Sequence, residues 1–238
     1  MKKRLLLLLM LMPLMVMGQG LTRDRVLRAM RQRPVAMGAD NLFNPEYFHL
    51  VEGKRVGLVG NHSSLLGDGK KHLLDTLLSR GVAVCTLYSP EHGFRGTAEA
   101  GAKVDNSTDE KTGLPIVSLY GKNKKPLPEQ LQGIDVMLFD LQDVGCRFYT
   151  YISTLHYVME SCAEHGIALV VLDRPNPHMN YVDGPVLEPQ QQSFVGMHPV
   201  PIVYGMSIGE YARMILGEHW LWMTGNAKGK WVQLSDKE

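Results

Sequence analysis

The sequence lacks the features that mark several common enzyme classes. Its three cysteines show none of the paired spacings of a zinc site or a redox motif. The first predicted strand runs into Gly60, Asn61 and His62 without G-x-G-x-x-G or the P-loop lysine pattern, so we expect no nucleotide cofactor. Ser63 and Ser89, which also follow predicted strands, lack the G-x-S-x-G elbow of serine hydrolases. Nucleotide-dependent and serine-nucleophile chemistry are therefore disfavoured.

The chain also lacks an excess of charge of either sign. It has 25 Lys and Arg against 24 Asp and Glu, a formal net charge of +1. A nucleic-acid-binding surface would normally show as a basic excess. We therefore expect a partner that is small or neutral overall, and no nucleic acid.

Long apolar runs are absent except at the N-terminus. There, Lys2, Lys3 and Arg4 precede an apolar run, Leu5–Met17, which small Gly18 follows. This is the pattern of a secretory signal peptide, and the run is short for a bilayer span. No cysteine follows it to accept a lipid. We expect residues 1–18 to be removed near Gly18, leaving a periplasmic or secreted protein without a stable membrane anchor.

After a basic, turn-rich lead-in, strand-like and helix-like segments alternate. Short apolar, β-branched runs predict strands at Arg55–Gly60, Val82–Tyr88, Ile116–Tyr120, Ile134–Phe139 and Ile167–Leu172. Continuous apolar runs are typical of strands covered on both faces. Leucines of 73–78 and the stripe of 152–162 predict helices, which Gly81 and Gly166 end. The alternation predicts an α/β fold with a doubly wound, mostly parallel sheet.

Polar side chains follow nearly every predicted strand. They are Asn61 and His62 after the first strand, Ser89 to Gly93 after the second, Asp140, Gln142 and Asp143 after the fourth, and Asp173, Arg174 and Asn176 after the fifth. Ligands of open α/β sheets bind outside the carboxyl ends of the strands. We therefore expect these loops to converge on one crevice.

The loop SPEHGFRG, Ser89–Gly96, places Glu91, His92 and Arg95 close together in the sequence, and its two glycines permit tight turns. Its position after a strand favours a functional role. The local sequence is equally compatible with a salt bridge between Glu91 and Arg95, with His92 bound to a backbone carbonyl.

The segment DLQDVGCRFYTY, Asp140–Tyr151, is the second polar cluster. Asp140 and Asp143 could hold a divalent metal or orient each other's hydrogen-bond partners. Only His92 offers a further ligand, so we expect no metal. Tyr149 and Tyr151 could equally be core residues with solvated hydroxyls.

Two further segments have plain structural interpretations. DRPNP, Asp173–Pro177, could be a turn held by a pair between Asp173 and Arg174. Ser207 and Glu210 form a capping box at the start of a helix, so we assign Glu210 a structural role.

Together these segments resemble a family of bacterial exo-acting β-N-acetylmuramidases, long described only as a domain of unknown function. The resemblance covers about Val51 to Leu221 and is carried by SPEHGFRG, FDLQDVGCRFYTYISTLHYVME, LDRPNP, VDGPVLEP and GMHPVPIVYGMSIGEYA. It implies a Rossmann-like catalytic domain without a nucleotide, whose crevice is closed by a smaller C-terminal subdomain. It also implies release of N-acetylmuramic acid from the non-reducing end of peptidoglycan fragments.

We therefore expect a signal peptide (1–18), a lead-in (19–50), the Rossmann-like catalytic domain (51–217) and the start of a truncated C-terminal subdomain (218–238). Family members continue well past this point. The competing interpretation is therefore a catalytically incomplete relative that binds amino sugars or acts as a scaffold. Tyr204 is a further departure, because it stands where the family favours histidine.

Glycoside hydrolysis needs a proton donor and a second group on the opposite face of the sugar. We expect Glu91 to be the donor, because nearby apolar residues can raise a carboxyl pKa. Asp143 or Asp140 is expected as the second group, followed by His92. Arg95 or Arg147 would meet the lactyl carboxylate of the substrate. The remaining predicted sugar-binding residues are Asn61, Gln142, Tyr149, Tyr151, Asp173, Arg174, Asn176 and Tyr204.

Overall fold

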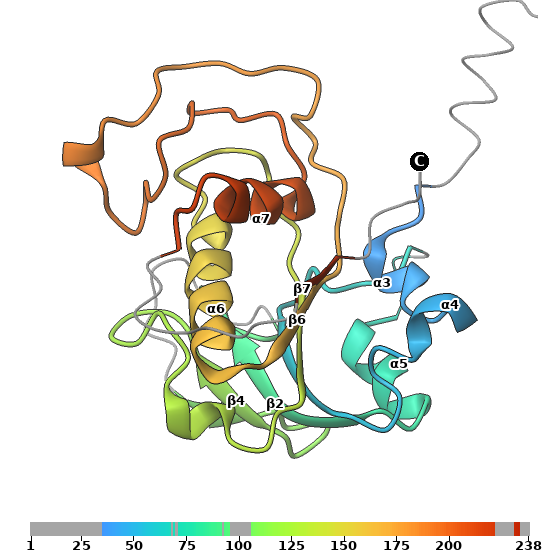
Figure 1. The fold of residues 1–238 in the computed structure, drawn as a ribbon. Coiled ribbons are helices and arrows are strands. Elements are labelled where there is room, and N and C mark those ends of the chain that lie inside the picture. Colours follow the sequence, from blue (N-terminus) through green and yellow to red (C-terminus); the bar gives the residue numbers. More distant parts are fainter. Residues whose placement is uncertain are drawn as a thin grey trace, which may run out of the picture. The chain divides into compact units, whose positions relative to one another are not determined.

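A computed structural model of the chain describes residues 35–67, 69, 71–91, 93–95 and 106–221, together with the backbone of 231–233. Figure 1 shows the arrangement of the elements. In chain order they are α3 (Gly38–Asn41), α4 (Pro45–Phe48), β1 (Arg55–Gly60), α5 (Leu73–Ser79), β2 (Ala83–Ser89), β3 (Ser107–Thr108), β4 (Pro115–Ser118), η1 (Pro128–Leu131), β5 (Val136–Asp140), α6 (Tyr151–His165), β6 (Ala168–Val171), η2 (Pro189–Gln191), α7 (Ile208–Gly217) and β7 (Trp231–Gln233).

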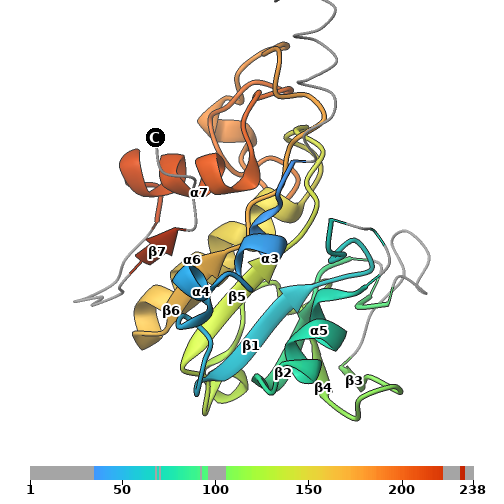
Figure 2. The ribbon, with the colours of Figure 1, turned by 90° about the vertical axis from the view of Figure 1, so that its right-hand side faces the viewer.

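The strands form a single sheet in the order β3-β4-β2-β1-β5-β6-β7 (Figure 2). All neighbouring pairs are parallel except β3 with β4. This confirms the predicted α/β fold with a mostly parallel sheet. The five predicted strands are present within one or two residues of their expected bounds. The exposed two-residue β3 carries no apolar pattern, which is why the sequence did not indicate it.

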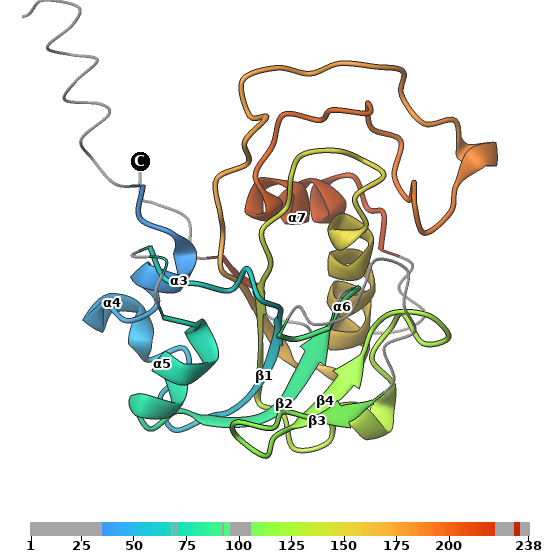
Figure 3. The same cartoon turned by 180° about the vertical axis from the view of Figure 1, so that it is seen from behind.

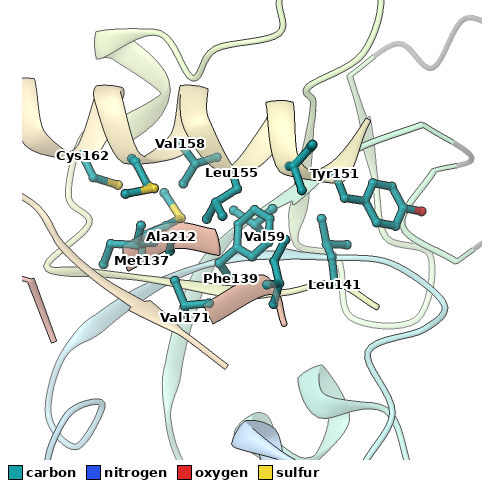
Figure 4. Packing of buried hydrophobic residues seen from close by; sticks show 14 of the residues in the cluster. Val59, Met137, Phe139, Leu141, Tyr151, Leu155, Val158, Cys162, Val171 and Ala212 are labelled. Carbon is teal, nitrogen blue, oxygen red and sulfur yellow. The ribbon is translucent and has the colours of Figure 1, made fainter. Parts of the chain in front are cut away.

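Helices cover both faces of the sheet, as continuous apolar strands require (Figures 1 and 3). Alternate residues of each strand face opposite sides. Val59 and Phe139 belong to the cluster under α6 and α7, part of which Figure 4 shows, whereas Leu58 and Leu138 pack with α3 and α5. The lead-in contributes to the second cluster, since Leu42, the C-cap residue of α3, is fully buried there.

The segment between β6 and α7 makes a long excursion away from the sheet (Figure 3). Asp183 pairs with Val203 at its base, and Ser193 pairs with Gly196 near its tip. The Ser153 hydroxyl of α6 donates to the Phe194 carbonyl at 2.7 Å, which fastens the tip to the domain. The excursion is therefore an irregular hairpin with defined contacts.

Two helices end in the same left-handed turn, but with different residues. After α6, Gly166 has φ +65°, and Ile167 N–H donates to the Cys162 carbonyl at 2.9 Å. After α7, His219 has φ +56°, and Trp220 N–H donates to the Ile215 carbonyl at 3.0 Å. Side chains beyond glycine strain this conformation, so His219 occupies a position that favours glycine.

We expect His219→Gly to stabilise the chain by about 0.5–1 kcal/mol, because relief of the left-handed strain outweighs the added freedom of the unfolded chain. The change corresponds to about 2 °C in melting temperature for a domain of this size. Gly166→Ala is the matched control and should lose a similar amount, since no atom lies within 4 Å of the added Cβ. Thermal melting of the three proteins would contradict the expectation if His219→Gly melted below the parent.

The predicted signal segment lies outside the described residues. Within the described ranges, no helix combines the length and apolarity needed to cross a bilayer. Cys85, Cys146 and Cys162 are free thiols, and Cys162 is buried on α6 as its place in the apolar stripe predicted.

Candidate active site

The predicted polar loops lie at one edge of the sheet. The register pairs Gly60 of β1 with Asp140 of β5, and Ser89 of β2 with Ser118 of β4, at the carboxyl ends of these strands. The loops that follow them therefore leave the same edge. This edge forms the candidate active site.

Asn61 anchors the loop after β1 and is fully buried. Its side-chain amide donates to the Tyr151 hydroxyl at 2.6 Å, and its side-chain oxygen accepts from Ser63 N–H at 2.8 Å. Tyr151 is 97% buried at the start of α6 and meets the Tyr149 ring edge-on, with centroids 4.6 Å apart. Asn61 and Tyr151 thus join the loop after β1 to α6, while half-buried Tyr149 remains partly accessible.

Glu91 lies in the half-buried part of the loop after β2. Burial raises the pKa of Tyr120, and the charge of Glu91 and a hydrogen bond to it raise that pKa further. Burial and a hydrogen bond with Tyr149 are the main causes of the raised pKa of Tyr151, and the charge of Glu91 makes a smaller contribution. Glu91 is therefore close to both tyrosines. Tyr120 was missed as a site residue because the sequence placed it inside a strand, whereas β4 ends at Ser118.

Asp143 is 97% buried, and its two oxygens have different surroundings. Oδ2 accepts a hydrogen bond from the Tyr204 hydroxyl and another from Gly145 N–H at 2.8 Å. Among the described residues, no group donates to Oδ1. Burial raises the pKa of Asp143, and hydrogen bonds from Tyr204 and from the backbone N–H groups of Gly145 and Val144 oppose that rise. A buried carboxylate oxygen without a donor is costly unless a ligand supplies one.

Gly145 makes the Asp143 geometry possible. Its φ of +74° turns its N–H toward Asp143, and a Cβ at this position would lie 2.3 Å from the Asn176 amide. The Asn176 side chain also donates to the Met206 carbonyl at 2.8 Å and accepts from His178 N–H. Asn176 is therefore 94% buried as a support of this turn and offers little surface to a sugar.

Asp140 is placed in a buried ion pair. Both of its oxygens accept hydrogen bonds from Arg174, Nε at 2.7 Å and Nη2 at 3.0 Å, and the two side chains are almost fully buried. Burial raises the pKa of Asp140, and the Arg174 guanidinium opposes that rise. This placement favours a structural role for both residues over the catalytic and substrate-binding roles that the sequence suggested.

Asp173 holds the N-terminus of α7. Its carboxylate accepts from the Ser207 hydroxyl at 2.7 Å and from Gly209 N–H at 2.8 Å. The Arg174 guanidinium pairs with Asp140 and not with Asp173, so the turn is not locked as the local sequence suggested. The stretch Gly205–Gly209 does read G-x-S-x-G, but Ser207 caps α7 together with Glu210, which confirms the predicted capping box.

The two arginines predicted to bind the substrate carboxylate differ in whether a carboxylate of the protein already occupies them. Arg95 donates to both oxygens of buried Asp109, at 2.8 and 2.9 Å, and this pairing lowers the pKa of Asp109 to about 2. Arg147 donates through Nη1 to the carbonyls of Pro185 and Val200, on the two limbs of the hairpin. Its guanidinium has no carboxylate partner among the described residues, so it is better placed than Arg95 to bind an anion.

The remaining predicted residues complete the site. The Gln142 side chain donates to the carbonyls of Asp143 and Pro175, at 2.8 and 2.9 Å, and so joins two loops. His92 lies outside the described residues and stays a prediction. Within the described ranges, no group of three or more His, Cys, Asp or Glu side chains could hold a metal ion. The edge thus places the loop that carries Glu91 and the buried carboxyl group of Asp143 beside buried tyrosines.

Comparison with known proteins gives consistent matches. A family profile described as exo-β-N-acetylmuramidase NamZ, N-terminal, matches residues 56–235. The peptidoglycan β-N-acetylmuramidase NamZ of Bacillus subtilis (strain 168) is 48% identical over 182 residues, which are 76% of this chain and 44% of the relative. The chain therefore spans less than half the length of this curated relative.

Two crystal structures of DUF1343 family proteins from Bacteroides fragilis NCTC 9343 are also similar. The first is 39% identical, with a TM-score of 0.74, and the matched region is 84% of this chain and 49% of the Bacteroides chain. The second is 43% identical, with a TM-score of 0.68, and the matched region is 79% of this chain and 48% of the Bacteroides chain. Both support the fold described above.

Proposed function

We propose, because the chain belongs to the exo-β-N-acetylmuramidase NamZ family, that it is a glycoside hydrolase of peptidoglycan. The bond cleaved in this proposal joins a terminal N-acetylmuramic acid, at the non-reducing end, to the rest of a peptidoglycan fragment. The product would enter cell-wall turnover or recycling. Export by the N-terminal segment 1–18 to the periplasm or the medium is part of the same proposal.

The observation that carries the proposal is the state of Asp143. Its buried Oδ1 has no donor among the described residues, while Tyr204 and Gly145 hold Oδ2 in place. A water molecule bound beside this oxygen would satisfy it. A fixed carboxylate at this position could stabilise the oxocarbenium-like transition state through its charge, or activate that water. We assign Asp143 as the second catalytic group.

Glu91 is proposed as the proton donor. It lies in the half-buried loop after β2, close to Tyr120 and Tyr151, so it can reach both ligand and solvent. A general acid must donate its proton in one step and recover it in the next. We do not assign Asp140 as the second catalytic group, because Arg174 occupies both of its oxygens. His92 is retained as a candidate in the same loop.

Substrate contacts are assigned to side chains that retain partial exposure. Tyr149, Gln142 and Arg147 are half-buried at the edge, and Arg147 would meet the lactyl carboxylate. Three buried side chains form the floor of the site. Asn61 donates to the Tyr151 hydroxyl, and the Tyr204 hydroxyl donates to Asp143. Arg95, Asp173, Arg174 and Asn176 support the loops that carry these groups.

A second candidate function is an amino-sugar-binding or scaffold protein with incomplete catalytic machinery. It is favoured by the placement of the two acids at the end of β5, because Asp140 is paired with Arg174 and Asp143 is 97% buried. Such a protein would bind muramic acid without turning it over. The assay below separates the two functions.

The chain should release N-acetylmuramic acid from an aryl N-acetylmuramide and act poorly on the matching N-acetylglucosaminide, which lacks the carboxylate. Arg147→Met should weaken the use of the muramide by about 10–100-fold in kcat/KM, since charge-assisted hydrogen bonds have this magnitude. The glucosaminide should be little affected. Steady-state kinetics on the two substrates provide the measurement.

Arg95→Met is the matched control, because its guanidinium is paired with Asp109. It should lower stability and leave the preference between the two sugars unchanged. An equal loss on both substrates in Arg147→Met would mean that Arg147 only holds the hairpin limbs together. Binding of the muramide without turnover by the parent would favour the second candidate function.

A further inference from the structure

A chain of buried polar side chains lies behind the candidate site and has no part in the roles assigned so far. His156 Nδ1 on α6 is 3.0 Å from His198 Nε2, and His198 Nδ1 is 3.1 Å from the Tyr211 hydroxyl on α7. All three side chains are at least 95% buried. Buried networks of this kind are costly unless every member is satisfied, so their arrangement is informative.

The donors and acceptors available to these three side chains fix the direction of their hydrogen bonds. Within the described contacts, His198 is the single partner of the Tyr211 hydroxyl, so that hydroxyl is satisfied as a donor only if His198 Nδ1 accepts. His198 then carries its proton on Nε2 and donates to His156 Nδ1. Burial lowers the pKa of His198 to about 3, which keeps the ring neutral as this direction requires.

The other side of Tyr211 faces the candidate site. Its ring packs against the ring of Tyr204, with centroids 4.8 Å apart, and Tyr204 donates its hydroxyl to Asp143 Oδ2. The charge of Asp143 contributes, after burial, to a raised pKa of Tyr211. Tyr211 is therefore held at its hydroxyl by His198 and contacts the residue that orients Asp143.

His198 also lines a cavity that is separate from the candidate site. The ring stacks on Trp220 with centroids 4.8 Å apart, and a cavity of about 230 Å³ opens beside the two side chains. Gln192 and Met197 of the hairpin also line it. His198 consequently has a fixed position that depends on the hairpin and on α6.

We infer that His198 is a positioning residue for Asp143: held by His156, it fixes the Tyr211 hydroxyl, and the Tyr211 ring in turn keeps the Tyr204 hydroxyl aimed at Asp143 Oδ2. The inference rests on the proposed role of Asp143 and extends it to a residue that touches neither substrate nor the reacting atoms. His198 acts through two aromatic side chains.

The test reads the protonation of Asp143 directly. Tyr204 donates to the ionised carboxylate, so loosening that bond must raise the pKa of Asp143. The carboxyl carbon shift of Asp143 would be followed by NMR against pH in the chain labelled at aspartate, with assignment from an Asp143→Asn spectrum. Tyr204→Phe should raise the midpoint by about one unit. This variant sets the full scale of the effect.

Two substitutions at His198 separate its two hydrogen bonds. The amide of His198→Asn reaches the place of Nδ1 and can accept from Tyr211, whereas that of His198→Gln reaches the place of Nε2 and can meet only His156. Tyr211→Phe removes the same bond from the other side. We expect Tyr211→Phe and His198→Gln to raise the Asp143 midpoint by about half a unit, and His198→Asn to leave it near the parent value.

Ser161→Ala is the control for destabilisation alone, because it removes a buried bond of α6 to the Pro126 carbonyl, 2.8 Å long. If all variants lose stability while the Asp143 midpoint stays within error, His198 is a structural residue and the inference is wrong. The same holds if His198→Asn and His198→Gln shift the midpoint equally.

The outcome is independent of whether the chain turns over substrate. If Asp143→Asn leaves turnover intact, the proposed role of Asp143 fails, and the coupling to His198 can still be measured. If the midpoints do not move while Asp143→Asn abolishes turnover, only the positioning inference fails.

Discussion

Glu91→Gln should lower turnover of a disaccharide with a terminal N-acetylmuramic acid by about 10² to 10⁴, while folding and binding persist. Glutamine keeps the size and hydrogen-bonding reach of the side chain but removes the transferable proton. General acid catalysis typically contributes a factor in this range. The measurement is kcat of parent and variant on the disaccharide, with binding of the product sugar followed by calorimetry.

The leaving group supplies an internal check on this assignment. An aryl leaving group needs less protonation than a sugar, so Glu91→Gln should lose less activity on an aryl N-acetylmuramide than on the disaccharide. Glu129→Gln alters an exposed carboxylate of η1 and serves as the control. Near-normal turnover of the disaccharide by Glu91→Gln, beside an active parent, would show that Glu91 is not the acid.

Arg174→Met should lower the free energy of unfolding by about 3–5 kcal/mol, because it leaves the Asp140 charge buried without its partner. Asp140 has no exposed surface, and both of its oxygens accept from Arg174. Arg174 Nη2 also donates to the Leu65 carbonyl at 2.9 Å, so the loop after β1 should loosen as well. Urea denaturation of the two proteins measures the loss.

The chain contains a matched exposed pair for comparison. Arg55 also donates to both oxygens of an aspartate, Asp135, but their side chains are 57% and 38% exposed. Solvent and salt screen exposed pairs, which therefore add little to stability, so Arg55→Met should have a small effect. If the two arginine variants were equally stable, the Asp140–Arg174 pair would not be structural, and Asp140 would return as a catalytic candidate.

The roles of Asp140 and Asp143 could not be told apart from the sequence. Asp140 is the last residue of β5 and Asp143 lies three residues further on, and no local feature separates the two acids. Their roles diverge because Arg174, 34 residues further along the chain, reaches Asp140, whereas Tyr204, 61 residues from Asp143, reaches the other carboxylate. Pairings over such distances depend on packing of the whole domain.

The α/β class, the parallel strands, the end of α6 at Gly166, the start of α7 at Ser207 and the edge where the polar loops meet could all be predicted from the sequence. Those features follow from apolar periodicity, glycine geometry and capping, which act over a few residues. The pairing of charged groups required the folded structure, which joins Arg95 to Asp109 and Arg174 to Asp140. A buried charge must find a partner wherever the fold brings one, so the carboxyl groups left for chemistry become evident only when the chain is folded.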